Sequence, residues 1–102
     1  MSDPDIRHVV FHSPGPQWRS EVDFREQPGV AEHVAHYRTL LEDGRLDLGG
    51  PFLEGAAGGM MVAAASVGAD ELDAFAAADP AVAAGLLTYE IRTWLVAMRQ
   101  AP

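Results

Sequence analysis

The chain has 102 residues, of which 48% are hydrophobic and 22% are charged, a composition that predicts one globular domain rather than a disordered or membrane-spanning chain. It contains no cysteine, which excludes a disulfide framework, a thiolate nucleophile and a cysteine-based zinc site. The net charge of −8 and the scattered arginines argue against nucleic acid and anionic membranes as partners, and the absence of a signal-peptide pattern predicts a cytoplasmic protein.

The N-terminal part of the chain predicts a strand followed by a long loop. Residues 1–5 are polar and are expected to be frayed. Residues 6–12 form a β-branched and aromatic run that is typical of a strand, and the sequence Ser-Pro-Gly-Pro ends it. Residues 17–28 are mostly polar and are expected to form a loop. Because loops of this length inside a compact domain are uncommon, this one is a candidate to cover a site.

A helix and two strands are expected in the middle of the chain. Apolar residues recur at helical spacing between residues 29 and 43 and predict a helix with one buried stripe, made of Val30, Val34, Tyr37 and Leu41. Residues 46–48 predict a short strand that breaks at the sequence Gly-Gly-Pro. Residues 60–66 form a continuous apolar run, which suits a strand buried on both faces.

The C-terminal part predicts a second helix and a final strand. Residues 69–78 have acidic side chains in their first turn and apolar ones spaced for burial, as in a helix. Asp79 precedes a proline and is therefore biased out of the helical region, so the helix is expected to stop there. A short helical turn is predicted over residues 80–84, and the alternating pattern of residues 88–98 predicts a long strand.

The order β-α-β-β-α-β predicts an α+β, ferredoxin-like fold over a single domain of residues 1–102, with a four-stranded antiparallel sheet and both helices on one face. The other face is expected to carry apolar side chains that need a cover, and these are Val10, Met61, Ala63, Leu95 and Trp94. Since a second copy of the sheet would cover them, the sequence predicts a homodimer.

The four histidines are the side chains whose ordinary pKa lies nearest neutrality. At 100° per residue, His33 falls on the shoulder of the predicted stripe, where it can reach the space between helix and sheet. His36 falls on the polar side, away from that space. His8 and His12 flank the first strand on the same face as Val10, and both are interpreted as solvent-edge or loop-facing imidazoles. A histidine at the edge of an apolar face is more often structural than catalytic, so His33 carries both interpretations.

Asp79 is the candidate partner of His33. An aspartate before a proline commonly caps the following amides, and a carboxylate held in that way is well suited to orient an imidazole. The competing hypothesis is a metal site made of His33 and His36 with Glu32 or Asp79. No third histidine supports it, and the glycine pairs lack a phosphate-binding motif. We therefore expect no metal and no cofactor.

Several segments together resemble a known family. His33 is followed by Gly44-Arg45-Leu46, then by the sequence Gly-Gly-Pro at 49–51, and then by Ala-Asp-Pro at 78–80 and Val-Ala-Ala-Gly at 82–85. This combination, over roughly residues 30–98, resembles the YciI-like (YCII-related) family of small proteins in the dimeric α/β-barrel superfamily. The resemblance implies a dimeric α/β barrel and a His–Asp dyad in a pocket, at His33 and Asp79.

The chain also departs from the family pattern. Family members often carry arginine three residues before the histidine, where this chain has Val30, and Arg25 in the preceding loop is the expected substitute. Arg25, Tyr37 and Pro51 are the residues expected to contact a substrate. Two functions stay open: a cofactor-free enzyme of the isomerase or lyase type that uses His33 for proton transfer on a small molecule, and a non-catalytic small-molecule-binding or accessory module.

Overall fold

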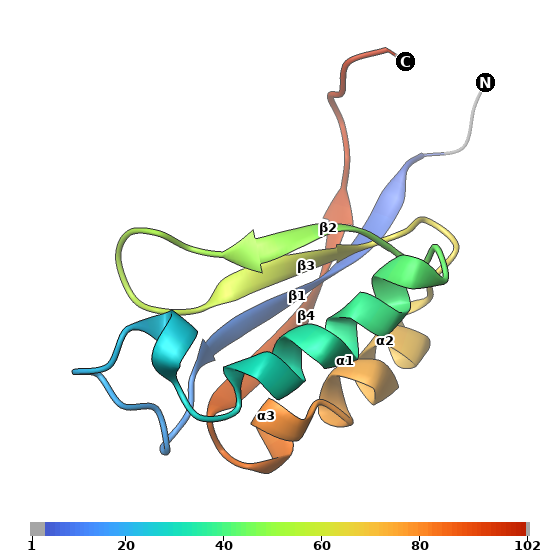
Figure 1. Ribbon diagram of the computed structural model, residues 1–102. Coiled ribbons are helices and arrows are strands. Elements are labelled where there is room, and N and C mark those ends of the chain that lie inside the picture. The colour runs from blue at the N-terminus through green and yellow to red at the C-terminus, as the bar shows by residue number, and fades with distance from the viewer. Residues whose placement is uncertain (1–3, 102) are drawn as a thin grey trace.

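The computed structural model describes residues 4–101 and contains a four-stranded sheet with helices packed on one of its faces (Figure 1). The elements in chain order are β1 (Ile6–Pro14), η1 (Phe24–Glu26), α1 (Val30–Glu42), β2 (Leu46–Pro51), β3 (Gly59–Ala63), α2 (Ala69–Ala77), α3 (Pro80–Ala83) and β4 (Leu87–Leu95). The sheet has the order β2-β3-β1-β4, and every neighbouring pair is antiparallel. The predicted ferredoxin-like α+β fold is thereby confirmed.

The strand boundaries differ from the predicted ones where backbone pairing overrides local signals. β2 does not break at Gly-Gly-Pro but continues to Pro51, because residues 49–51 pair with residues 59–61 of β3. β3 ends at Ala63 rather than residue 66, since a turn follows in which the Val67 amide donates to the Ala64 carbonyl. β4 likewise ends at Leu95 and not at residue 98.

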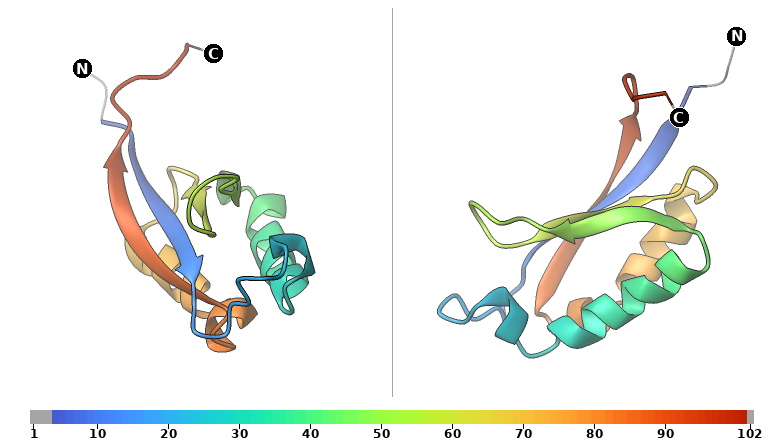
Figure 2. Two further views of the ribbon diagram at one scale, coloured as in Figure 1. Left: turned by 90° about the vertical axis from the view of Figure 1, so that its left-hand side faces the viewer. Right: turned by 45° about the horizontal axis from the view of Figure 1, so that its top comes forward.

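The fraying expected of residues 1–5 stays a prediction: residues 1–3 lie outside the described residues, and Asp5 makes several polar contacts. The Asp5 carbonyl accepts a hydrogen bond from the Val96 amide, and its carboxylate pairs with Arg7 and Arg99. As a result, the start of β1 and the end of β4 run side by side beyond the other strands (Figure 2).

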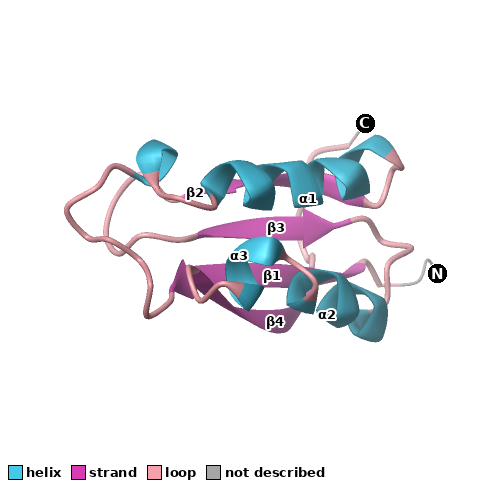
Figure 3. Ribbon diagram, turned by 60° about the horizontal axis from the view of Figure 1, so that its bottom comes forward, coloured by secondary structure: helices cyan, strands magenta, loops and turns pink. Residues whose placement is uncertain are grey.

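The helices cover one face of the sheet, as Figure 3 shows, and the main core lies beneath α1 and α2. Its buried members are Val10, Tyr37, Leu40, Leu46, Ala63, Val67, Leu72 and Ala76. A second cluster, made of Ala81, Leu86 and Leu87, fixes α3 against β4, with Trp18 and Val30 packed on it. No helix within residues 4–101 has the length and apolar character that crossing a membrane requires.

Two predictions about buried faces need correction. Val10, Met61 and Ala63 lie on the helix-covered face, in or against the main core, and so they cannot require a second copy as their cover. Leu95 follows Ile91 on that same face by strand alternation, although it is 55% exposed at the end of β4. Of the five residues assigned to the open face, Trp94 is on it, opposite Arg7 in β1.

The predicted stripe of α1 is also only partly buried. Tyr37 and Leu40 are buried, whereas Val34 and Leu41 are 44% and 45% exposed. The helix therefore packs on the core through Tyr37 and Leu40, whereas Val34 and Leu41 lie on a side of α1 that the core does not cover. Both of these residues line a cavity.

Candidate active site

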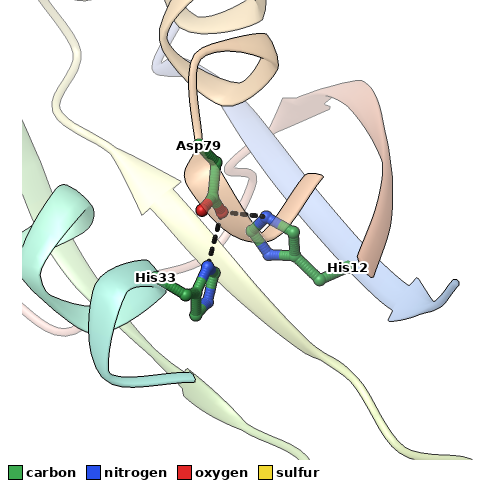
Figure 4. A group of neighbouring side chains, drawn as sticks. All are labelled: His12, His33 and Asp79. Atoms are coloured by element: carbon green, nitrogen blue, oxygen red, sulfur yellow. Dashed lines mark hydrogen bonds and ion pairs between the residues drawn. The ribbon is translucent and has the colours of Figure 1, made fainter. Parts of the chain in front are cut away.

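Three ionisable side chains from three separate elements meet at one end of the helix-covered face (Figure 4). Asp79 comes from the junction of α2 and α3, His33 from the first turn of α1, and His12 from the end of β1. Each offers one ligand-type atom, and these atoms all lie within 4.8 Å of one another.

Asp79 is held by its role as the N-cap of α3. Its backbone is extended (φ −60°, ψ 123°), Pro80 occupies the first helical turn, and the carboxylate Oδ1 accepts a hydrogen bond of 2.9 Å from the Ala81 amide. This is the local structure that the Asp-Pro sequence predicts. The side chain is fully buried, so both of its oxygens depend on protein partners.

His33 supplies the second partner. Its Nδ1 lies 2.5 Å from Asp79 Oδ2, so the contact expected between these two residues is present. Because a carboxylate only accepts hydrogen bonds, Nδ1 carries the proton, and in the neutral ring Nε2 keeps its lone pair. The side chain is 12% exposed and lines the cavity described below. An imidazole in this state can act as a general base.

His12 is the member of the cluster that the sequence interpretation missed. It is buried, its Nε2 lies 3.9 Å from Asp79 Oδ2 and 3.4 Å from the Tyr37 hydroxyl, and its ring meets that of His33 edge to face. The signal was available, because His12 shares a strand face with Val10. Because Val10 was assigned to the open face of the sheet, His12 was assigned to that face as well. Gly58 lets β3 pass close by, since a Cβ there would clash with the His12 carbonyl.

Burial and the neighbouring charges set the protonation states of the cluster. Burial, assisted by His33, lowers the pKa of His12 from 6.5 to about 4 against the opposing effect of Asp79. Burial and the Asp79 charge raise the pKa of Tyr37 well above its usual value. Burial also opposes ionisation of Asp79, but the hydrogen bonds from His33 and the Ala81 amide hold its pKa below the usual range. At neutral pH, His12 and Tyr37 are therefore neutral and Asp79 is an anion.

A cavity of about 320 Å³ opens beside the cluster. Its polar wall contains His12, His33, Tyr37 and Arg38, and its apolar wall includes Trp18, Phe24, Val34, Leu41, Pro51 and Met61. Val34 and Leu41 are half-exposed because they face this space rather than the core. The 17–28 loop contributes Trp18 and Phe24 to this wall, and its role as the cover of a functional site stays a prediction.

The loop is held in place by a buried glutamine. The Gln27 side-chain amide donates to the carbonyls of Arg19 and Val22 and accepts from the Arg19 amide. These bonds satisfy the polar atoms of Gln27, which is only 3% exposed. The segment is therefore an ordered wall of the cavity, with η1 as its single helical turn.

The residues expected to contact a substrate fall into two groups. Tyr37 and Pro51 line the cavity. Arg25 is exposed, pairs with Asp23 at 3.5 Å and stacks over the Phe24 ring, and it is not among the lining residues. The arginine among the residues that line the cavity is Arg38, which the sequence interpretation did not single out. Substrate contact by these residues stays a prediction.

The helical angles predicted His36 on the polar side of α1, and this prediction is wrong. Its Nε2 lies 2.7 Å from the Phe75 carbonyl, and its ring stacks on that of Phe75 with centroids 3.9 Å apart. The angles failed because Phe75 of α2 reaches this side of α1 and stacks on the His36 ring. His36 therefore serves the contact between the two helices.

The same placement changes the metal hypothesis. The group that can offer three ligands is His12, His33 and Asp79, not a pair of histidines one turn apart on α1. Zinc ligands about 2.0–2.1 Å from a tetrahedral ion stand roughly 3.3 Å apart, whereas His33 Nδ1 and Asp79 Oδ2 are 2.5 Å apart. The pair as found has the geometry of a hydrogen bond rather than that of two metal ligands.

Comparison with known proteins agrees with the resemblance seen in the sequence. A search of curated proteins found no match to the chain. The family model of the YCII-related domain matches residues 7–95, which include both the His33 and Asp79 segments and the strand that carries His12. The chain therefore belongs to the YCII-related domain family.

Proposed function

We propose that the protein is a small-molecule enzyme that transfers a proton through His33, in an isomerase- or lyase-type reaction without a cofactor. One observation carries this proposal: the imidazole of His33 is bonded at 2.5 Å to a fully buried carboxylate and also lines a cavity. A purely structural histidine needs a hydrogen-bond partner, but its ring does not need to be exposed to a cavity.

The proposed chemistry follows from the hydrogen positions. His33 Nε2 removes a proton from a substrate carbon next to a carbonyl, and the resulting imidazolium is stabilised by the Asp79 anion, which donates no proton itself. The electron pair of the broken C–H bond moves into the carbonyl, giving an enolate. His33 then returns the proton to another atom of the same substrate in an isomerisation, or to the leaving group in an elimination.

Neutral donors stand beside the base. Tyr37 is buried in the cavity wall, and its raised pKa keeps the hydroxyl protonated. A neutral imidazole at His12 also retains one N–H. Either group can donate to an oxygen on which negative charge develops, which is where a fixed donor accelerates such a reaction most.

The test starts with ligand discovery. Thermal-shift screening against a metabolite library identifies binders, since a ligand at about 100 times its Kd adds about 2.7 kcal/mol of stability. Each binder is then incubated with the protein in D2O and analysed by mass spectrometry for deuterium at carbon. The proposal predicts exchange or turnover with at least one binder and its loss in the His33→Ala variant. Exchange that persists in that variant would contradict it.

The alternative is a non-catalytic binding or accessory module, and the predominantly apolar cavity wall is the observation that favours it. A binding module would hold its ligand without promoting deuterium exchange. It would also bind with unchanged affinity after His33→Ala, because nothing in binding requires the base.

A homodimer is proposed on a basis different from the sequence argument. The helix-free face carries Leu48 and Trp94, which are 64% and 47% exposed, together with Phe11 and Met60 by strand alternation. The same alternation places Arg7, Glu90 and Arg92 on this face, and its apolar side chains favour a second sheet as their cover. Sedimentation showing only a mass near 10.9 kDa would contradict the dimer. The cytoplasmic location stays a prediction.

A further inference from the structure

We propose that the ligand of this cavity is an apolar carboxylate whose anionic group is bound by Arg38. The proposal rests on the cavity being the binding site, as in the proposed function, and it specifies the chemical class of the ligand. It follows from where Arg38 lies, from its lack of a protein partner and from the composition of the wall around it.

Arg38 lies on the part of α1 that faces the cavity. Val34 precedes it by four residues and Leu41 follows by three, the spacing that places side chains on one helical face. All three line the cavity, and the two apolar residues are half-exposed. The exposed Arg38 side chain thus lies on the same helical face as this apolar wall and is among the residues that line the cavity.

Carboxylates of the protein do not neutralise Arg38. The ion pairs that arginines form within residues 4–101 engage Arg7, Arg25, Arg45 and Arg99, and none involves Arg38. Glu42, four residues later on the same helix, forms no ion pair with it either. In a chain with fifteen acidic residues and seven arginines, the absence of such a pair leaves the cationic group available to a ligand.

The remaining wall selects the rest of the ligand. No aspartate or glutamate is among the residues described as lining the cavity, while Trp18, Phe24 and Met61 contribute apolar surface. A ligand anion therefore meets no carboxylate in the wall itself, since Asp79 contacts His33 but does not line the cavity, and an apolar body buries hydrocarbon. A guanidinium matches a carboxylate through two parallel hydrogen bonds. The wall therefore favours a carboxylate on a compact apolar body over a neutral or cationic ligand.

The position of Arg38 also relates the anion to the base. His33 and Arg38 are five residues apart, so their backbones are separated by about 7.5 Å along the helix axis. A ligand that reaches both groups therefore extends along α1 from His33 to Arg38, both of which line the cavity.

The experiment compares each acid with its neutral isostere. Benzoate and 2-naphthoate, each with its primary amide, are titrated into the full-length protein by calorimetry at neutral pH and low salt. We expect the carboxylates to bind about tenfold more tightly than the amides, the ratio that about 1.4 kcal/mol produces. Added salt should reduce this preference, because it screens the charge.

Three variants assign the effect to a residue. Arg38→Gln should abolish the preference for the acid while leaving amide binding unchanged, which also reports that the variant is folded. Arg25→Gln tests the other candidate guanidinium. Arg19→Gln controls for net charge, since the Arg19 side chain has no ion pair within residues 4–101 and does not line this cavity. If Arg38→Gln does not fold, Arg38→Lys replaces it and should weaken the preference, because a lysine lacks the two-pronged geometry.

Each other outcome overturns the proposal in a distinct way. Equal binding of acid and amide by the unmodified protein would refute the charge assignment and leave the proposed function standing. Loss of the acid preference in Arg25→Gln alone would mean that Arg25 of the 17–28 loop, and not Arg38, binds the carboxylate. An equal loss of the acid preference in Arg19→Gln would mean that the preference arises from the net charge of the protein and not from a local contact. Failure of every probe to bind would overturn this inference, whereas the proposed function would still be decided separately by the deuterium-exchange test.

Discussion

The two histidines of α1 lie one turn apart, and their partners give them different capacities. His33 is bonded to a buried carboxylate and opens onto a cavity, whereas His36 is bonded to a backbone carbonyl and stacked on Phe75. Both bonds fix an imidazole. Only the carboxylate can stabilise the charge that a base acquires when it accepts a proton, so the partner, not the residue type, distinguishes a candidate base from a packing residue.

The largest expected effect separates these two residues by activity. Once a substrate is known, His33→Ala should lower kcat by about 10²–10⁴-fold, the usual contribution of a general base. His36→Ala should retain kcat within a few-fold, because the cavity and Asp79 are untouched. Steady-state kinetics on both variants measures the difference. An equal loss in both would mean that the contrast between the two partners has no functional consequence.

The second prediction concerns variants that lack the Asp79 carboxylate, the partner that distinguishes His33 from His36. Asp79→Ala should destabilise the protein by about 2–4 kcal/mol, since it deletes the cap of α3 and leaves the buried Nδ1–H of His33 without an acceptor. Chemical denaturation measures this change.

Asp79→Asn is the matched variant. It preserves the cap of α3 and the side-chain volume but removes the charge that stabilises the His33 imidazolium, so its stability should lie between that of Asp79→Ala and the unmodified protein. Activity should nevertheless fall strongly. A fully active Asp79→Asn variant would show that the carboxylate acts only as a cap.

The site could be predicted from sequence only where local rules govern it. Asp79 before Pro80 defines its own cap, and the helical angle correctly brings His33 toward the sheet. His36 could not be placed, because the helical angle contains no information about Phe75 of α2, which stacks on the His36 ring. His12 was missed for a related reason: alternation pairs it with Val10, but only the tertiary structure tells which face of the strand is inside.

The fold itself was more predictable than the site because the order of its elements restricts the topology. The boundaries of its helices and strands were less predictable than their order. The continuation of β2 through Gly49 and Gly50 depends on pairing with β3, a long-range interaction that overrides the weak strand propensity of glycine. The orientation of Val34 and Leu41 depends on a cavity, and hydrophobic spacing alone does not distinguish a cavity wall from a core.

The third prediction concerns the pH dependence of stability. Because the pKa of His12 falls from 6.5 to about 4 on folding, the unfolded chain binds the proton more readily between these values. Stability should therefore be complete above pH 6.5 and decline as the pH falls toward 4, by at most about 3 kcal/mol. The lowered pKa of Asp79 acts in the same direction at still lower pH, since its contribution is lost as the folded carboxylate becomes protonated.

Denaturation midpoints measured across this range test the assignment, with His12→Gln as the variant that cannot titrate. Its stability should change less with pH above 4 than that of the unmodified protein. If the two profiles have the same slope, the acid sensitivity arises at another group and His12 is not held neutral by burial.

The smallest expected effect returns to His36 and concerns stability alone. His36→Ala removes a hydrogen bond to the Phe75 carbonyl and a stacked ring contact, which together should cost about 1–2 kcal/mol at a partly buried position. His36→Gln can still donate to the carbonyl but cannot stack, so it should recover part of the loss. Thermal denaturation of both variants, read beside their unchanged kcat, measures the packing role separately from the chemistry. A His36→Ala variant as stable as the unmodified protein would show that this side of α1 is held by its apolar contacts with the core, chiefly through Leu40 and Tyr37, and that the bond to Phe75 contributes little.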